Sequence, residues 1–222
     1  MMGLFTEMGP CTLDPNSTHT TPNPHSWNNN ASVLFIDQPA GTGLSPIAAD
    51  RPLPDTDIEG AVDFQVFLNV FFRDIFQDLA HLPIHIAAES YGGHYAPVYT
   101  HHIIDSRAYN SRDAFWGNIT SLILVNALVD RAATFEGTYE LLCSPHIRGS
   151  ILNDTACDSI AAALPECTRL GELCQLTEDG EVCEASWEYC IRTVGQPYED
   201  ERLAGRRSPF NSKPGSPRSG GR

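Results

Sequence analysis

The sequence predicts an α/β protein built on a parallel, doubly wound sheet and followed by a helical segment rich in cysteine. Patterns typical of strands and helices alternate between residues 33 and 128, with short connections, as they do in parallel sheets. Six of the seven cysteines then fall between residues 143 and 190. We therefore expect a sheet core over residues 1–128, a helical insertion over 129–198 and a tail over 199–222.

The predicted core contains three strands and two helices. Apolar runs bounded by turn residues predict the strands, and the long helix begins with acidic and hydroxyl residues that suit a cap. A turn rich in proline and glycine, "QPAGTGLS", follows the first strand. In order, we expect a strand over 33–37, a helix over 56–79, a strand over 84–88, a helix over 94–108 and a strand over 119–128.

Composition narrows the class of protein. The chain of 222 residues is 41% hydrophobic, with a formal net charge of −14, so we expect a globular protein that binds no nucleic acid. No apolar run is long enough for a membrane span.

The C-terminal tail differs in charge from the rest of the chain. Residues 202–222 hold six of the fourteen Lys and Arg and no acid, which leaves eight basic residues against 28 acidic ones elsewhere. This tail is rich in Pro, Gly and Ser, so we expect it to be disordered. It is either a regulatory tail or out-of-frame or intron-derived sequence.

The cysteine spacing predicts disulfides. The last four cysteines are 7, 9 and 7 residues apart, and residues seven apart lie on one helix face. Two antiparallel helices joined at "LTEDGE" (176–181) would pair Cys174 with Cys183 and Cys167 with Cys190, leaving Cys143 with Cys157. Zinc binding is the alternative, but no two of these cysteines have the close spacing of a zinc knuckle. We expect disulfides, no metal and no cofactor.

Four possible glycosylation sites agree with a secreted protein. N-x-[ST] triplets begin at Asn16, Asn30, Asn118 and Asn153, and such triplets are acceptors in secreted proteins. Disulfides also indicate the secretory pathway, with a vacuolar or extracellular destination. The start "MMGLFTEMGP" has neither the basic nor the apolar region of a signal peptide, so we expect an N-terminal segment to be missing.

The stretch "HIAAESYGGHYAPV" (85–98) predicts a nucleophile at Ser90. Ser90 follows a predicted strand and precedes a predicted helix, and the pattern G-x-S-x-G marks a tight strand–turn–helix that exposes its serine. Ala88 replaces the first glycine, and Gly92 and Gly93 complete the elbow. The start of the helix also supplies an oxyanion donor, the Tyr91 N–H. The alternative is a glycine turn that only caps a helix.

Three segments resemble the serine carboxypeptidases, and the cysteine spacing resembles their fungal, carboxypeptidase Y-like branch. They are "GLFTEMGPC" (3–11), "NPHSWNNNASVLFIDQPAGTGLS" (23–45) and the Ser90 stretch. The resemblance covers about residues 3–198 and implies a partial α/β-hydrolase fold. It also implies release of C-terminal amino acids from peptides or proteins through an acyl-enzyme.

The resemblance assigns roles to individual residues. Ser90 would be the catalytic nucleophile, and Glu89 and Glu7 would bind the carboxylate of the substrate. Two carboxyl groups that face a third repel it unless one is protonated, so such a site works best in acid. Asp37 is expected to form a turn, because the triad acid follows the serine in this fold.

The partners of Ser90 are missing from the expected places. A serine nucleophile needs a base and an acid that orients it. His94, His101, His102 and His146 are the histidines after Ser90, and none follows a later core strand. We therefore expect the chain to lack the triad Asp and His and to be inactive as given. Two alternatives remain: an acyltransferase of the same family, and a non-catalytic binding fragment.

Overall fold

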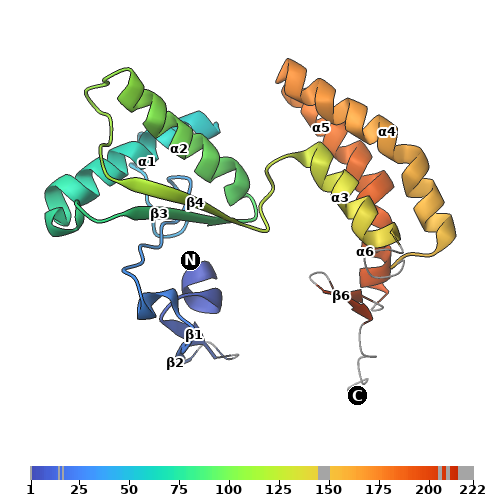
Figure 1. Cartoon of the computed structure of the whole chain (residues 1–222), viewed down its shortest axis with the longest axis horizontal. Coiled ribbons are helices and arrows are strands. Elements are labelled where there is room, and N and C mark those ends of the chain that lie inside the picture. Colours follow the sequence, from blue (N-terminus) through green and yellow to red (C-terminus); the bar gives the residue numbers. More distant parts are fainter. Residues whose placement is uncertain are drawn as a thin grey trace. The chain divides into compact units, whose positions relative to one another are not determined.

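The computed structural model describes residues 2–14, 16, 18–144, 151–204, 207–208 and 211–214. The chain divides into two compact units, Met1–Ala127 (unit 1) and Leu128–Arg222 (unit 2). Figure 1 shows the elements of both units. The division lies one residue before the boundary expected from the sequence.

Unit 1 carries the predicted alternation of strands and helices. The two strands after the first helix, β3 and β4, pair in parallel, with Ile86 opposite Leu122 and Ala88 opposite Leu124. Two shorter strands, β1 and β2, form an antiparallel pair near the N-terminus. In chain order the elements are β1 (Cys11–Leu13), β2 (Thr20–Pro22), α1 (Asp57–Val70), β3 (Ile84–Glu89), α2 (Gly92–Ala108) and β4 (Ile119–Val125).

Helix α1 begins where its sequence predicts. The Thr56 hydroxyl accepts a hydrogen bond from the Glu59 N–H at 3.2 Å, and the Glu59 carboxylate accepts one from the Asp55 N–H at 2.9 Å. These reciprocal bonds satisfy N–H groups that a helix start leaves free. The α-helix ends at Val70 rather than at Leu79, so the single helix predicted over 56–79 is wrong in its last third. A π-helical turn (Phe71–Ile75) and a 3-10 turn (Gln77–Leu79) follow.

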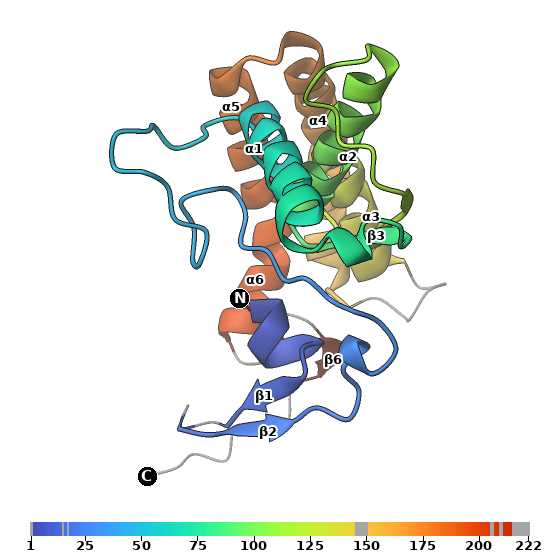
Figure 2. The same ribbon diagram turned by 90° about the vertical axis from the view of Figure 1, so that its left-hand side faces the viewer.

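The core of unit 1 lies between its helices and one face of the β3–β4 pair. Its buried residues come mainly from α1 and α2, and Ile84 and Ile86 of β3 pack against them. Figures 1 and 2 show α1 and α2 side by side. The buried members of the cluster are Ala61, Phe64, Leu68, Tyr99, Ile103 and Phe115.

The doubly wound arrangement expected from the sequence is not present in the described residues. The sheet there has two strands, and both helices pack on the side of Ile84 and Ile86. His85, Ala87 and Glu89 alternate with these residues and are exposed. A doubly wound sheet would bury them under further helices, because its strands are covered on both faces.

The strand expected over residues 33–37 is also absent. These residues form no ladder in the structure, although Ile36 packs against the core of unit 1. The apolar run therefore reflects packing rather than pairing. Asp37 ends the run, and its Oδ2 accepts a hydrogen bond from the Leu44 N–H at 2.8 Å. Gly43 has a φ of +49°, and an added Cβ would lie 2.1 Å from that Oδ2, so the turn requires glycine there.

Unit 2 is built from helices. The structure contains the antiparallel helix pair that the cysteine spacing predicts: α4 and α5 are separated by a turn at Glu178, which has a left-handed φ of 52°. Asp179 caps α5 by accepting a hydrogen bond from the Val182 N–H at 3.0 Å. The helices are α3 (Arg131–Cys143), α4 (Asp154–Thr177), α5 (Gly180–Cys190) and α6 (Gln196–Leu203), with a π-helical turn over Ile191–Gly195.

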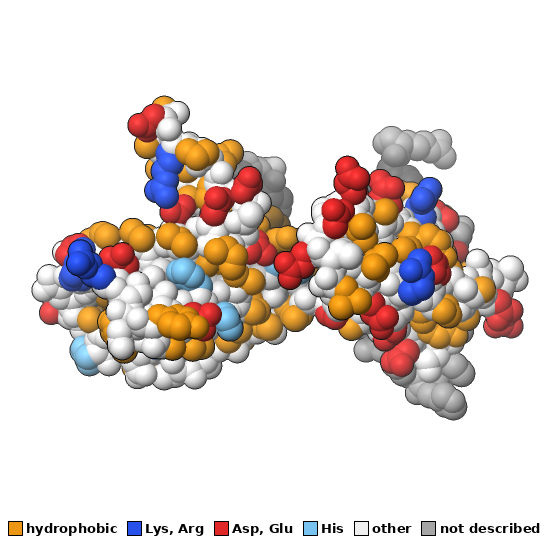
Figure 3. Space-filling model, turned by 90° about the horizontal axis from the view of Figure 1, so that it is seen from above, with side chains coloured by type: hydrophobic (Ala, Val, Ile, Leu, Met, Phe, Trp, Pro, Cys, Tyr) orange, Lys and Arg blue, Asp and Glu red, His pale blue; other side chains and the backbone are white. Residues whose placement is uncertain are grey.

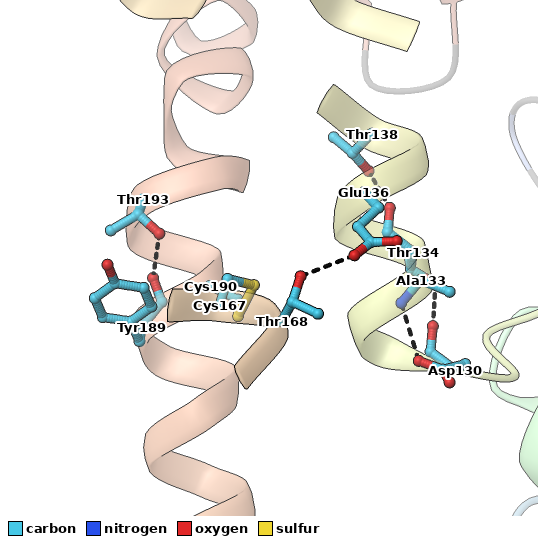
Figure 4. The surroundings of a disulfide bond; sticks show 10 residues. All are labelled: Asp130, Ala133, Thr134, Glu136, Thr138, Cys167, Thr168, Tyr189, Cys190 and Thr193. Carbon is cyan, nitrogen blue, oxygen red and sulfur yellow. Dashed lines mark hydrogen bonds between the residues drawn. A yellow bond between two sulfur atoms is a disulfide. The ribbon is translucent and has the colours of Figure 1, made fainter. Parts of the chain in front are cut away.

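Three disulfides stabilise unit 2. They join Cys143 to Cys157, Cys167 to Cys190 and Cys174 to Cys183, the same pairs that the spacing indicates. Cys167 and Cys190 are both buried, in one cluster with Phe135, Leu142, Leu152, Ile160 and Val194. Figure 4 shows this disulfide and the hydrogen bond from the Thr168 hydroxyl to Glu136 (2.9 Å), which joins α4 to α3.

The helical part of unit 2 extends into the segment that was expected to be disordered. Helix α6 continues through residue 199, the expected start of disorder, to Leu203. The Glu199 carboxylate accepts hydrogen bonds from the Arg202 guanidinium, and the Gln196 amide donates to Asp200 at 2.8 Å. Such pairs three or four residues apart stabilise a helix, so the prediction of disorder is wrong for 199–203. Two short strands, β5 (Arg207–Ser208) and β6 (Asn211–Pro214), pair in antiparallel fashion, and the remaining tail residues lie outside the described part.

Acidic side chains are spread over the surface of unit 2 (Figure 3). Residues 128–204 contain fifteen Asp and Glu and five Arg. Within the described residues, no helix is both long and apolar enough to cross a membrane.

Candidate active site

Ser90 lies at the sharp corner between β3 and α2. Its backbone is left-handed, with a φ of 56°, a conformation that costs a residue with a side chain about 1–3 kcal/mol. Two hydrogen bonds hold the corner: the Ser90 N–H donates to the Val125 carbonyl at 3.2 Å, and the Gly93 N–H donates to the Ser90 carbonyl at 3.0 Å. The first bond joins the corner to the end of β4. Ser90 is exposed, so its hydroxyl is accessible to a substrate.

Small neighbours make this corner possible. A Cβ added to Gly92 would lie 2.7 Å from the Cβ of Ala88, which is closer than two such atoms pack. The chain therefore needs glycine at 92 and a small residue at 88, and alanine at 88 leaves just enough space. Gly93 is buried at the start of α2. These contacts give a physical reason for the small residues that the sequence pattern contains.

The first turn of α2 carries the candidate oxyanion donor. Within the described residues the Tyr91 N–H has no backbone acceptor, as expected at a helix start, where several N–H groups are unsatisfied. The positive end of the helix dipole lies at the same place. A developing negative charge beside Ser90 would be stabilised by both.

Aromatic rings surround this turn. The Tyr91 ring stacks on the His94 ring with centroids 4.8 Å apart and meets the edge of Tyr95 at 5.0 Å. This cluster was not predicted from the sequence, although His94 and Tyr95 follow Tyr91 by three and four residues, a spacing that brings side chains together on a helix. The rings orient the residue whose N–H is the candidate donor.

Glu7 and Glu89 meet beside the corner. A hydrogen bond joins their carboxyl groups, and the pKa of Glu7 is raised by burial, by this bond and by the charge of Glu89. Glu7 ends a π-helical turn over Gly3–Glu7, and the Asn23 amide donates to its carbonyl at 3.0 Å. The structure thus brings together two residues that are 82 positions apart in the sequence.

No general base contacts Ser90 in the part of the chain that the structure describes. No hydrogen bond joins Ser90 Oγ to a histidine or a carboxylate there. The His94 ring stacks on Tyr91 and its Nε2 is buried without a partner. His101 pairs with Asp105 on α2 at 3.2 Å, His102 lies on the same helix, and His146 lies outside the described residues.

The remaining predicted residues lie on the surface. Asn16, Asn30, Asn118 and Asn153 are all exposed. The Asn153 Oδ1 accepts a hydrogen bond from the Ala156 N–H at 2.9 Å and caps α4, so a sugar on its nitrogen would leave the cap in place. In the part of the chain that the structure describes, no three His, Cys, Asp or Glu side chains are grouped as metal ligands would be.

Comparison with known proteins identifies the family. The family model described as serine carboxypeptidase matches residues 1–201. Carboxypeptidase Y of Candida albicans is 36% identical over 201 residues, and carboxypeptidase Y homolog A of Arthroderma otae is 34% identical over 199 residues. Each alignment covers 90% of this chain and 35% of the relative, so the chain spans about a third of their length.

A solved structure shares the fold. The crystal structure of Kex1(delta)p, a prohormone-processing carboxypeptidase from Saccharomyces cerevisiae, superposes with a TM-score of 0.67 at 22% identity. The match covers 87% of this chain and 42% of that one. The fold is therefore part of that carboxypeptidase fold, and the matched family model extends over nearly the whole chain. The chain belongs to the serine carboxypeptidase family.

Proposed function

We propose that this chain provides the nucleophile of a serine-type carboxypeptidase. The observation that carries the proposal is Ser90, held with a left-handed backbone between β3 and α2 and exposed beside an unpaired Tyr91 N–H. Its Oγ would attack the last peptide carbonyl of a substrate, form an acyl-enzyme ester and release the C-terminal amino acid. Water would then hydrolyse the ester and regenerate the serine.

Glu7 and Glu89 support recognition of a free C-terminus. The raised pKa of Glu7 keeps its carboxyl group protonated at higher pH than usual, and a protonated carboxyl group donates a hydrogen bond to a carboxylate that an ionised one would repel. The substrates would be peptides or proteins with free C-termini, bound best in acid. An acidic compartment of the secretory pathway, vacuolar or extracellular, also suits the three disulfides and the four exposed sequons.

We further propose that the 222-residue chain does not turn over substrate by itself. Ser90 has no base among the described residues, and a serine without its histidine loses most of its rate enhancement. The test is hydrolysis of a blocked dipeptide at about pH 5, because a site that binds a carboxylate through carboxyl groups is expected to work best in acid. An acyl-enzyme burst followed by turnover, both abolished by Ser90→Ala, would contradict the inactivity.

The role of Ser90 is tested separately in a protein that has a base. Residues 1–198 would replace the matching segment of Candida albicans carboxypeptidase Y. We expect this chimaera to react with a fluorophosphonate probe and to release C-terminal amino acids, and Ser90→Ala to lower the rate by more than about 10⁴-fold. Ser111→Ala is the control, because that exposed serine lies in the loop after α2. Equal labelling of the Ser90→Ala and parent chimaeras would refute the proposal.

A further inference from the structure

A small cavity lies between α2 and β4, within unit 1. Its volume is about 190 Å³. The residues from α2 are spaced four and three apart and so share one helix face, and Figure 1 shows α2 lying beside β4. The lining residues are Thr100, Ile104 and Arg107 from α2 and Ile119, Thr120, Ser121 and Leu122 from β4.

Arg107 brings a positive charge to this cavity without a carboxylate to balance it. Its Nε donates to the Phe115 carbonyl and its Nη2 to the Gly117 carbonyl, both at 2.6 Å. These bonds fix the plane of the guanidinium and use two of its five N–H groups, so three remain to donate to a ligand. Within the described residues no Asp or Glu lies within ion-pair distance of Arg107, and burial lowers its pKa. A partly desolvated cation of this kind is stabilised by an anion.

Thr100 adds an unused hydroxyl group. Its Oγ1 is buried and has no hydrogen-bond partner in the structure, whereas the hydroxyls of Thr134 and Thr138 in α3 donate to the carbonyl four residues earlier. In β4, by contrast, the hydroxyls of Thr120 and Ser121 are already engaged, at 3.3 and 2.7 Å from His85 Nδ1. An unsatisfied buried hydroxyl destabilises the fold, and a ligand that accepts a hydrogen bond from it would remove this cost.

We propose that this cavity binds a small oxyanion, a carboxylate or a phosphate, through the Arg107 guanidinium and the Thr100 hydroxyl. The fixed plane of Arg107 suits the paired oxygen atoms of such groups. Ile104, Ile119 and Leu122 add apolar side chains to the lining. The site is independent of Ser90 and of the proposed peptidase reaction.

The experiment is an NMR titration of the full 222-residue chain. Inorganic phosphate, acetate and chloride would be added separately at constant ionic strength, while the Arg107 Nε–H signal and the amides of 119–122 are followed. We expect saturable shifts with phosphate, acetate or both, which identifies the class of oxyanion, and none with chloride. Shifts that do not saturate, or that chloride reproduces, would overturn the proposal.

Two substitutions and one control assign the ligands. Thr100→Val keeps the shape of the side chain and leaves both hydrogen bonds from Arg107 to backbone carbonyls in place, so the fold should persist. The affinity for the oxyanion should fall by about threefold to tenfold. Arg107→Gln should lower affinity by about tenfold or more. Arg112→Gln removes an exposed arginine of the nearby loop and should leave affinity unchanged. Unchanged affinity in folded Thr100→Val, or equal losses in Arg107→Gln and Arg112→Gln, would show that Arg107 only joins the loop to α2. If Arg107→Gln does not fold, the affinity of the folded Thr100→Val variant tests the proposal.

Discussion

Ser90 has a left-handed backbone at a corner that small neighbours and a hydrogen bond support. The contact between the Gly92 position and the Ala88 Cβ and the bond from the Ser90 N–H to the Val125 carbonyl act on the same corner. The sequence pattern predicts such a corner, since G-x-S-x-G is a local signal. The meeting of Glu7 with Glu89 was expected only from resemblance, because no local pattern relates residues so far apart.

Gly92→Ala tests the tight packing of this corner. The new Cβ would meet the Ala88 Cβ at 2.7 Å, and overpacking of this kind lowers the free energy of unfolding by about 1–3 kcal/mol. Hydrogen exchange in rising urea, read by mass spectrometry on α2 peptides, measures the change.

Gly137→Ala is the matched control for that measurement. Gly137 is exposed within α3, and an added Cβ there meets nothing within 4 Å. Read on α3 peptides in the same urea series, the control should raise stability by about 0.5–1 kcal/mol, because alanine favours helix. Equal effects of the two substitutions would mean that the corner is not tightly packed.

Glu89→Gln tests the carboxyl pair. It removes the charge of Glu89, so the pKa of Glu7 should fall toward its ordinary value but stay somewhat raised, because burial is the largest cause of the shift. In the parent chain protonation of Glu7 favours the folded state, and this contribution is lost as pH rises through the raised pKa. Carbon NMR of the Glu7 carboxyl group measures the titration.

Asp130 is the internal reference for the titration. Its pKa is lowered mainly by the hydrogen bond from the Ala133 N–H, which Glu89→Gln does not touch, so it should not change. An unchanged pKa of Glu7 in Glu89→Gln would show that the two groups do not interact in solution.

At the scale of elements, the helices were predictable and the sheet was less so. Helix signals are local, and the cap at Thr56 lies where the sequence places it. A strand depends on a neighbour that the local sequence does not contain, which is why residues 33–37 resemble a strand but form no ladder. The nested cysteines are an exception, since their spacing relates two helices directly.

The disulfides of the α4–α5 pair should differ in importance. Replacing Cys167 and Cys190 together by alanine removes a buried bond from the cluster of unit 2 and should lower the free energy of unfolding by about 3 kcal/mol or more. Replacing Cys174 and Cys183 should cost less, because that bond closes a shorter loop near the helix turn. Urea unfolding followed by Trp187 fluorescence, with Trp27 and Trp116 replaced by phenylalanine, measures both. A larger effect for the second pair would contradict the assignment of Cys167–Cys190 to the core.

At the scale of the molecule, the two units depend on different interactions. Unit 1 has a core of helices on a parallel strand pair and, among its described residues, no disulfide, while its Cys11 is a free thiol. Unit 2 has its own buried cluster and all three disulfides. The sequence indicates this division through the position of its cysteines. It does not reveal that helices cover only one face of the sheet, because coverage depends on how distant segments pack.

Reduction should therefore separate the stabilities of the two units. Disulfides stabilise a fold chiefly by restricting its unfolded chain, so their loss affects only the unit that contains them. With dithiothreitol, we expect α4 and α5 peptides to exchange hydrogen at lower urea than in the oxidised chain, while α1 and α2 peptides keep their midpoint. Mass spectrometry of both sets in one urea series makes each the control for the other. Equal shifts in both would mean that the units unfold as one cooperative structure, and no shift in α4 and α5 would mean that the disulfides do not stabilise unit 2.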